Sequence, residues 1–166
     1  MPPSSEFPAA IRFAETAQAF CSLVETSATY ERRAFFERCF HLVSRLVSEA
    51  VELPDVRGEL DTMLSRVTDE SYRAVLEGLK RQAGDQDYYK MVFDPWDKTE
   101  EPIYGSVSDD LADTWSELKE GLLALEAGSV ANAICDWRFS FLHHWGPYHA
   151  THVLRPLFAL CFDGDF

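Results

Sequence analysis

The stretch SVSDDLADTWSELKEGLLALEAG, residues 106–128, decides the fold of this chain. Large apolar side chains recur within it every three or four residues, a period that places them on one face of an α-helix: Leu111, Trp115, Leu118, Leu122 and Leu125. Ser106 and Asp109 have the spacing of a capping box, and Gly128 is a typical helix end. The stretch therefore predicts a long amphipathic helix whose N-cap is Ser106 or Ser108.

The same apolar period recurs on both sides of this stretch and predicts further helices. The first runs from Pro8 to about residues 27–29, and the second covers Phe35–Val47 and ends at or before Leu53. The third begins at a Thr68 cap and ends at Gly84. Two more follow the central stretch, one around residues 134–144 and one from about Tyr148 to Leu160. Gly146-Pro147 is expected to break the chain between the last two helices. Residues 55–67 are ambiguous, although Leu60, Met63 and Leu64 favour a short helix. We therefore predict an all-α, single-domain helical bundle of about five to seven helices. Residues 1–7 would form a loose tail, residues 8–163 the helical domain, and residues 85–107 one long aromatic-rich loop.

The composition restricts the classes of partner. The chain has 166 residues, with 28 acidic against 15 basic side chains and a formal net charge of -13. Such a surface repels nucleic acid and anionic membranes, so neither is an expected partner. It is compatible with a basic protein, with cations, or with a charge that only maintains solubility. The four cysteines have no C-x-x-C spacing, and the N-terminus resembles no signal peptide, so we expect a cytoplasmic protein with reduced thiols.

The aromatic segment at residues 85–107 is the first candidate for function. A loop of this length in a compact domain is either functional or the sign of an unrecognised element, and Tyr88–Phe93 fits a short helix or an extended stretch. The segment carries Tyr88, Tyr89, Phe93, Trp96 and Tyr104. Exposed aromatic residues, here and at the Trp145-Gly146-Pro147 turn, are typical anchors of protein interfaces. The alternative, which we favour, is that these side chains fold back as a lid over the bundle, because monomers seldom expose large apolar patches.

Acidic and histidine side chains are the second candidate. Helical spacing places Asp110, Asp113, Glu117 and Glu120 on one stripe away from the leucine face, so the default interpretation is a solvated surface. The opposite interpretation is a divalent metal site, which could draw on Asp109, Asp110, Asp113, His144, His149 and His152. The spacing of His149 and His152 is a weak signal, and no H-E-x-x-H, P-loop or G-x-S-x-G motif is present. No cofactor is evident, although a divalent metal stays possible.

Several phrases of this sequence are similar to a bacterial family, domain of unknown function 5063. They are YKMVFDP at residues 89–95, SVSDDLAD at 106–113, WRFSF at 137–141 and HWG at 144–146, and the opening Phe13-Ala14, Phe20-Cys21 and Val24-Glu25 fits as well. Trp115 stands where the family more often has Tyr. The resemblance implies a cytosolic, helical bacterial protein and supplies no activity. It directs attention to the polar and aromatic residues within these phrases: Asp109, Asp110, Asp113, His144 and Trp145.

Three functional hypotheses follow. The first is a non-enzymatic protein-binding or adaptor module with an acidic surface, which binds a protein partner of basic character. Its candidate surface comprises Tyr89, Phe93, Trp96, Tyr104, Asp109, Asp110, Asp113, His144 and Trp145. The second is a metal-dependent enzyme or metal sensor built on the Asp and His groups. The third is an immunity-type protein that neutralises a basic toxin by charge complementarity. The sequence specifies neither the partner nor the oligomeric state.

Overall fold

A computed structural model describes residues 7–58 and 66–162. Its α-helices are α1 (Pro8–Glu25), α2 (Arg32–Ala50), α3 (Asp69–Ala83), α4 (Val107–Glu126), α5 (Val130–Ser140) and α6 (Thr151–Phe162). Short 3-10 turns, η1 (Ser27–Thr29) and η2 (Gly84–Gln86), follow α1 and α3, and a π-helical segment, η3 (Phe141–Ala150), joins α5 to α6. Two strands, β1 (Tyr88–Met91) and β2 (Ile103–Ser106), lie between η2 and α4. The expectation of an all-α fold is confirmed.

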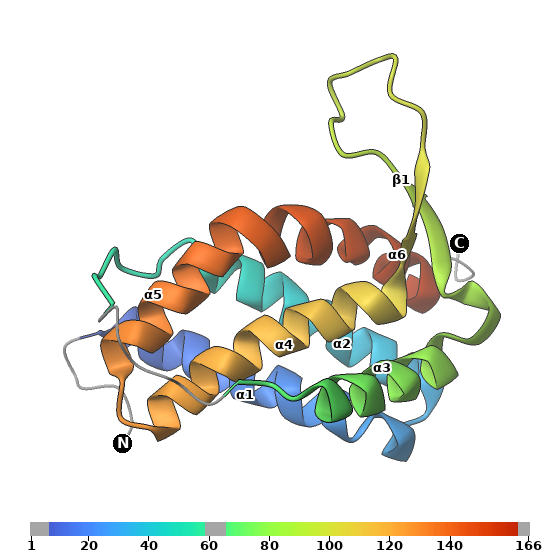
Figure 1. Cartoon of the computed structure of the whole chain (residues 1–166). Coiled ribbons are helices and arrows are strands. Elements are labelled where there is room, and N and C mark those ends of the chain that lie inside the picture. The colour runs from blue at the N-terminus through green and yellow to red at the C-terminus, as the bar shows by residue number, and fades with distance from the viewer. Residues whose placement is uncertain (1–6, 59–65, 163–166) are drawn as a thin grey trace.

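Helix α4 is the central element, as its apolar face predicts. It packs against α1, α3, α5 and η3 (Figure 1), and Leu111, Trp115 and Leu118 are buried. The Ser106 hydroxyl accepts the backbone N–H of Asp109 at 3.1 Å, which confirms Ser106 as the N-cap. Burial of one continuous apolar stripe, rather than helix propensity, is what stabilises such a helix.

A close approach between α4 and α5 depends on Gly121. The indole of Trp137 lies directly over this glycine, so that a Cβ carbon there would stand 2.0 Å from the indole nitrogen. The same N–H donates to the Leu118 carbonyl at 3.0 Å, and the ring also packs on Phe13. Trp137, one of the largest fully buried side chains of the core, is thus held by close packing and by one hydrogen bond.

The expected break at Gly146-Pro147 is wrong. The helix continues from α5 through η3 into α6, with Pro147 inside the π-helical segment and Pro156 inside α6. A Cβ carbon at Gly146 would lie 2.2 Å from the Phe141 carbonyl oxygen, so this turn requires glycine. Trp145 is consequently not part of an exposed turn: it is 0% exposed and packs against Phe13 and Phe141.

The expected loop at residues 85–107 contains a β-hairpin instead. Strands β1 and β2 pair antiparallel, with Tyr88 opposite Ser106 and Met91 opposite Ile103. Figure 1 shows this ribbon and its connecting loop standing out from one end of the bundle. The two strands satisfy the backbone groups that face each other, which lets the segment extend beyond the helices.

Other expectations have mixed outcomes. The end of α2 before Leu53, the Thr68 cap and the Gly84 stop, with φ +60°, are confirmed. Residues 1–6 of the predicted tail, and the short helix suggested by Leu60, Met63 and Leu64, lie outside the described residues, whereas Phe7 packs against the core. Within the described ranges, no helix combines the length and apolar character needed to cross a membrane.

Candidate functional site

Two carboxylates of α4 face the protein rather than solvent. Asp110 retains only 7% of its side-chain exposure and Asp113 27%, because η3 lies across this part of α4. The interpretation of this stripe as a solvated surface is therefore wrong for these two residues. Helical periodicity separated the acids from the leucine face, but it could not show that a second neighbouring element covers them.

His149, which η3 contributes, lies between the two carboxylates. Its Nδ1 is 2.9 Å from Asp110 Oδ1 and its Nε2 is 3.4 Å from Asp113 Oδ2. Burial alone would lower the pKa of His149, but the hydrogen bond with Asp110 and the negative charges of Asp113, Asp110 and Asp109 outweigh it and raise the pKa above its ordinary value. The imidazolium, which donates from both nitrogens, is the form that this geometry favours.

Two tyrosines complete the arrangement. The Tyr89 hydroxyl, from β1, donates to Asp110 Oδ2, and the Tyr72 hydroxyl, from α3, donates to Asp113 Oδ1 at 2.6 Å. Burial raises the pKa of both phenols, and the hydrogen bonds to the carboxylates raise it further. These five residues, which we call the carboxylate–histidine network, connect the hairpin, α3, α4 and η3. Each carboxylate receives one phenol and one imidazole nitrogen.

Gly105 lets Tyr89 reach this network. It pairs with Tyr89 across the hairpin, and a Cβ carbon at Gly105 would stand 2.7 Å from the Tyr89 ring carbon Cζ. The tyrosine ring therefore lies flat across the glycine, which directs its hydroxyl to Asp110. A side chain at position 105 would occupy the space that this ring needs.

A second carboxylate fixes the base of the hairpin. Asp87 is buried and accepts the Ser108 backbone N–H at 2.7 Å, the Ser108 hydroxyl at 2.8 Å and the Ser106 hydroxyl at 3.2 Å. The Asp87 carbonyl also accepts the Val107 N–H at 2.8 Å. An anion at the start of α4 is further stabilised by the helix dipole. The junction between hairpin and helix is therefore rigidly specified.

The remaining histidines do not join one centre. His144 Nδ1 is 2.8 Å from Glu117 Oε1, and its ring makes an edge contact with His149 at 4.9 Å between centroids. His152 instead bonds the Tyr148 carbonyl at 3.1 Å and touches Phe93. Among residues 7–58 and 66–162, no group of three or more His, Cys, Asp or Glu side chains is arranged to hold a metal ion. Of the six metal candidates, the structure brings together Asp110, Asp113 and His149, as an ion-paired network.

A pocket of about 530 Å³ opens between the hairpin and η3, directly above these groups. Its lining combines polar and apolar side chains: Tyr88, Met91, Phe93, Ile103, Tyr104, Gly105, Ser106, Asp109, Asp110, His144, Tyr148 and His149. The volume lies within the range of about 300–1,000 Å³ usual for ligand sites. Five of the nine residues of the candidate surface therefore line this pocket: Phe93, Tyr104, Asp109, Asp110 and His144. Tyr89, Trp96, Asp113 and the buried Trp145 are not part of its lining.

Most aromatic residues of the hairpin and its loop are exposed, so the expected lid is wrong for them. Trp96 is 88% exposed, Tyr104 70% and Phe93 52%. Phe93 touches Tyr148 edge-on at 5.9 Å, and Tyr89 alone of the predicted aromatics reaches the carboxylate–histidine network. Because each strand of a ribbon alternates its side chains between two faces, one face turns toward the bundle and the other toward solvent.

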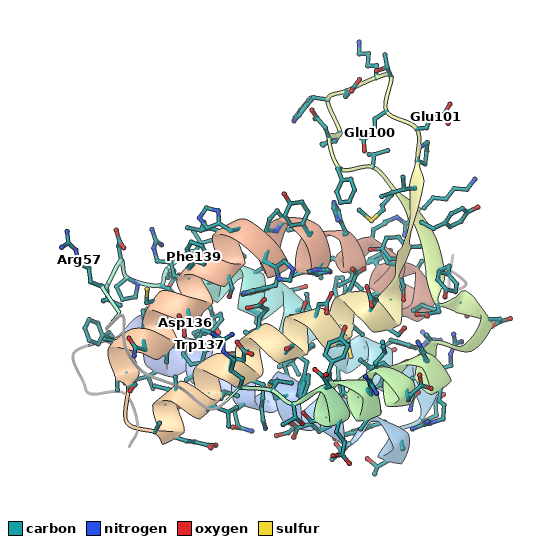
Figure 2. All side chains as sticks on the ribbon, viewed as in Figure 1. Arg57, Glu100, Glu101, Asp136, Trp137 and Phe139 are labelled. Carbon is teal, nitrogen blue, oxygen red and sulfur yellow. The ribbon has the colours of Figure 1, made fainter. Side chains whose placement is uncertain are left out.

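The loop that carries Trp96 is held by its own hydrogen bonds. The Glu100 carboxylate accepts the backbone N–H groups of Phe93 and Asp94 at 2.8 and 2.9 Å, and Asp94 accepts the N–H of Trp96 at 2.9 Å. Figure 2 shows Glu100 directed into this loop and Glu101 directed away from it. The aromatic side chains are thus presented on a preformed scaffold.

Two residues of the site escaped the sequence analysis. Tyr72 lies among the apolar positions of α3, and only the structure shows that its hydroxyl reaches Asp113. Asp87 carried no signal, because its partners lie across the hairpin.

Comparison with known proteins was informative for family and fold. The family model described as "Domain of unknown function (DUF5063)" matches residues 4–163. The crystal structure of protein BF1032 from Bacteroides fragilis is similar to this chain, with a TM-score of 0.81, 21% sequence identity and 93% of each chain covered, which shows a likeness of fold. No functionally curated protein matches the chain. The match over nearly the whole sequence confirms the resemblance carried by the phrases at residues 89–146, and the chain belongs to the DUF5063 family.

Proposed function

We propose that this chain is a non-enzymatic protein-binding module, and that it binds its partner through the hairpin and the adjoining pocket. The observation that carries the proposal is the exposure of large aromatic side chains on a projecting, internally hydrogen-bonded loop, with Trp96 88% exposed. Solvent exposure of such a side chain is unfavourable, whereas Trp and Tyr are the residues most enriched among interface anchors. A preformed scaffold lowers the entropy lost on binding.

The charge of the chain supports a basic partner. The net charge is -13, and the pocket beside the hairpin contains Asp109 and Asp110. Complementary charge accelerates the encounter of two proteins and disfavours acidic competitors. The expected partner therefore presents basic and apolar groups to the hairpin, and its binding weakens as salt rises.

The metal hypothesis receives less support from the same residues. Metal ligation requires a free nitrogen lone pair on a neutral imidazole. Both nitrogens of His149 instead lie within reach of carboxylates, and the pKa of this histidine is raised by its acidic neighbours against the opposing effect of burial. The ion-paired arrangement suits a structural role in fixing the hairpin.

A pull-down with matched variants tests the proposal. The tagged protein, the double variant Trp96→Ala/Tyr104→Ala and the control Phe139→Ala are each exposed to lysate of the source cells at low and moderate salt. Phe139 is 64% exposed on α5, and Figure 2 places it far from the hairpin. We expect a partner that the wild type and Phe139→Ala retain and that the double variant loses. An identical set of bound proteins for all three would refute the hairpin as the interface.

A further inference from the structure

Asp109 lies exposed in the first turn of α4, at the pocket, and it is the carboxylate of the pocket that no other described residue pairs. Asp110 and Asp113 are engaged by His149 and the two tyrosines, whereas no hydrogen bond or ion pair joins the Asp109 carboxylate to any residue within the described ranges. Burial raises the pKa of Asp109, and the charges of Asp113 and Asp110 raise it further. Three carboxylates against one imidazolium leave two negative charges in this group, so a bound cation would relieve their repulsion.

The walls above Asp109 are apolar and aromatic. Met91 and Ile103, opposite each other in the hairpin, belong to the lining, as do Phe93 and Tyr148, whose rings meet edge-on at 5.9 Å. A bare metal ion gains nothing from such walls. A long side chain with a hydrocarbon stem and a charged end matches both parts, since its stem contacts the walls while its end reaches the carboxylate.

We infer that this pocket receives an arginine side chain of the protein partner, with the guanidinium on the Asp109 carboxylate and the methylene groups between the hairpin and Tyr148. The inference rests on the proposed function and specifies the chemistry of the partner at this site. Charge complementarity and the mixed lining of the pocket select the occupant.

Arginine fits this lining better than lysine does. Its planar guanidinium binds a carboxylate through two parallel N–H groups and also stacks on aromatic rings such as those of Tyr148 and Phe93, and it is more weakly hydrated than an ammonium group. A lysine would form a point contact with Asp109 and retain more of its hydration. Arginine is accordingly also the charged residue most enriched at interface centres.

A titration monitored by NMR tests this inference without the partner. Backbone amide spectra of the labelled protein are recorded with N-acetyl-arginine amide, with its neutral isostere N-acetyl-citrulline amide, and with N-acetyl-lysine amide, all at matched ionic strength. We expect the arginine probe to shift the amides of Gly105 and Asp109 with a Kd on the order of millimolar, because a single side chain supplies only a small part of an interface. The citrulline probe should produce no saturable shift, and the lysine probe should bind about tenfold more weakly.

Two variants with the same change of charge locate the site. Asp109→Asn should weaken the arginine probe at least about tenfold, and Glu101→Gln, in the hairpin loop but outside the pocket, should leave the Kd unchanged. Spectra of each variant without probe verify that the fold is retained. Absence of saturable shifts with the arginine probe, equal binding of lysine or citrulline, or equal effects of the two variants would overturn the inference.

The two proposals fail separately. Saturable arginine binding that depends on Asp109, together with a pull-down unaffected by Trp96→Ala/Tyr104→Ala, would retain the pocket and refute the hairpin interface. A hairpin-dependent partner with no arginine binding would retain the interface and refute the occupant of the pocket.

Discussion

Substitution of Gly105 by alanine gives the sharpest test of how the hairpin is attached. Positive φ is confined, among the described glycines, to Gly84 and Gly128, so the backbone at position 105 accepts a Cβ carbon. That carbon would nevertheless stand 2.7 Å from Cζ and 2.9 Å from the hydroxyl oxygen of Tyr89, whereas ordinary contact begins at 3.4 Å. The Tyr89 ring must therefore move and withdraw its hydroxyl from Asp110.

The expected cost follows from that hydrogen bond. A hydrogen bond to a charged group contributes about 1.5–3 kcal/mol, and replacing glycine by alanine in a strand recovers roughly 0.5–1 kcal/mol of backbone entropy. Gly105→Ala should thus lower the free energy of unfolding by about 1–2 kcal/mol, which corresponds to a fall in Tm of roughly 2–8 °C for a domain of this size. Thermal and urea unfolding followed by circular dichroism measure both quantities.

A double-mutant cycle isolates the cause. In a Tyr89→Ala background the ring is gone, so Gly105→Ala should cost nothing or stabilise slightly. Tyr89→Phe measures the hydrogen bond to Asp110 by itself. If Gly105→Ala destabilises the protein equally with and without the Tyr89 ring, the clash lies elsewhere and the account of the hairpin attachment is wrong.

Three further predictions concern the network and the core. The folded-state pKa of His149 is raised above the unfolded value of about 6.5, so its stabilising contribution is complete below that pH and is lost as pH rises through the folded pKa. The difference in unfolding free energy between wild type and His149→Gln should shrink over that interval, and a pH-independent difference would contradict the ion pair with Asp110. Asp87→Ala should lower the free energy of unfolding, measured in urea, by about 2–3 kcal/mol, because buried hydrogen-bond donors at the start of α4 lose their acceptor. A loss below about 0.5 kcal/mol, typical of surface positions, would show that the Asp87 carboxylate is not needed to hold the hairpin. Gly121→Ala should cost about 3 kcal/mol or more, since its Cβ would overlap the Trp137 indole, and the loss should appear as a lower Tm and altered near-ultraviolet circular dichroism; an unchanged Tm would refute the packing described.

The sequence predicted the elements that depend on local periodicity. The sequence predicted the apolar face of α4, its Ser106 cap and the glycine that ends α3. It could do so because the hydrogen bonds of an α-helix join residues four apart, and the buried side chains of a helix recur every three or four residues. The sequence also supplied candidate residues that the structure places together: Asp109, Asp110, His144 and His149 line one pocket. The sequence singled out Asp109 and Asp110 as acids early in the helix that follows Ser106, and His144 and His149 as histidines grouped near the end of the chain.

The arrangement of these residues required the tertiary structure. Whether Asp110 faces solvent or protein depends on where η3 crosses α4. The π turn at Gly146-Pro147, which brings His149 to Asp110, has no reliable pattern in the local sequence. The sequence pattern did not predict the pairing of β1 with β2 either, because this pairing joins segments separated by a loop. The sequence by itself determined a helical bundle, an acidic character and the set of reactive side chains, because these follow from composition and short-range periodicity. Only the tertiary structure decided that, among the described residues, Asp110 of the pocket is paired and Asp109 is not, because burial and ion pairing depend on contacts between elements distant in the chain.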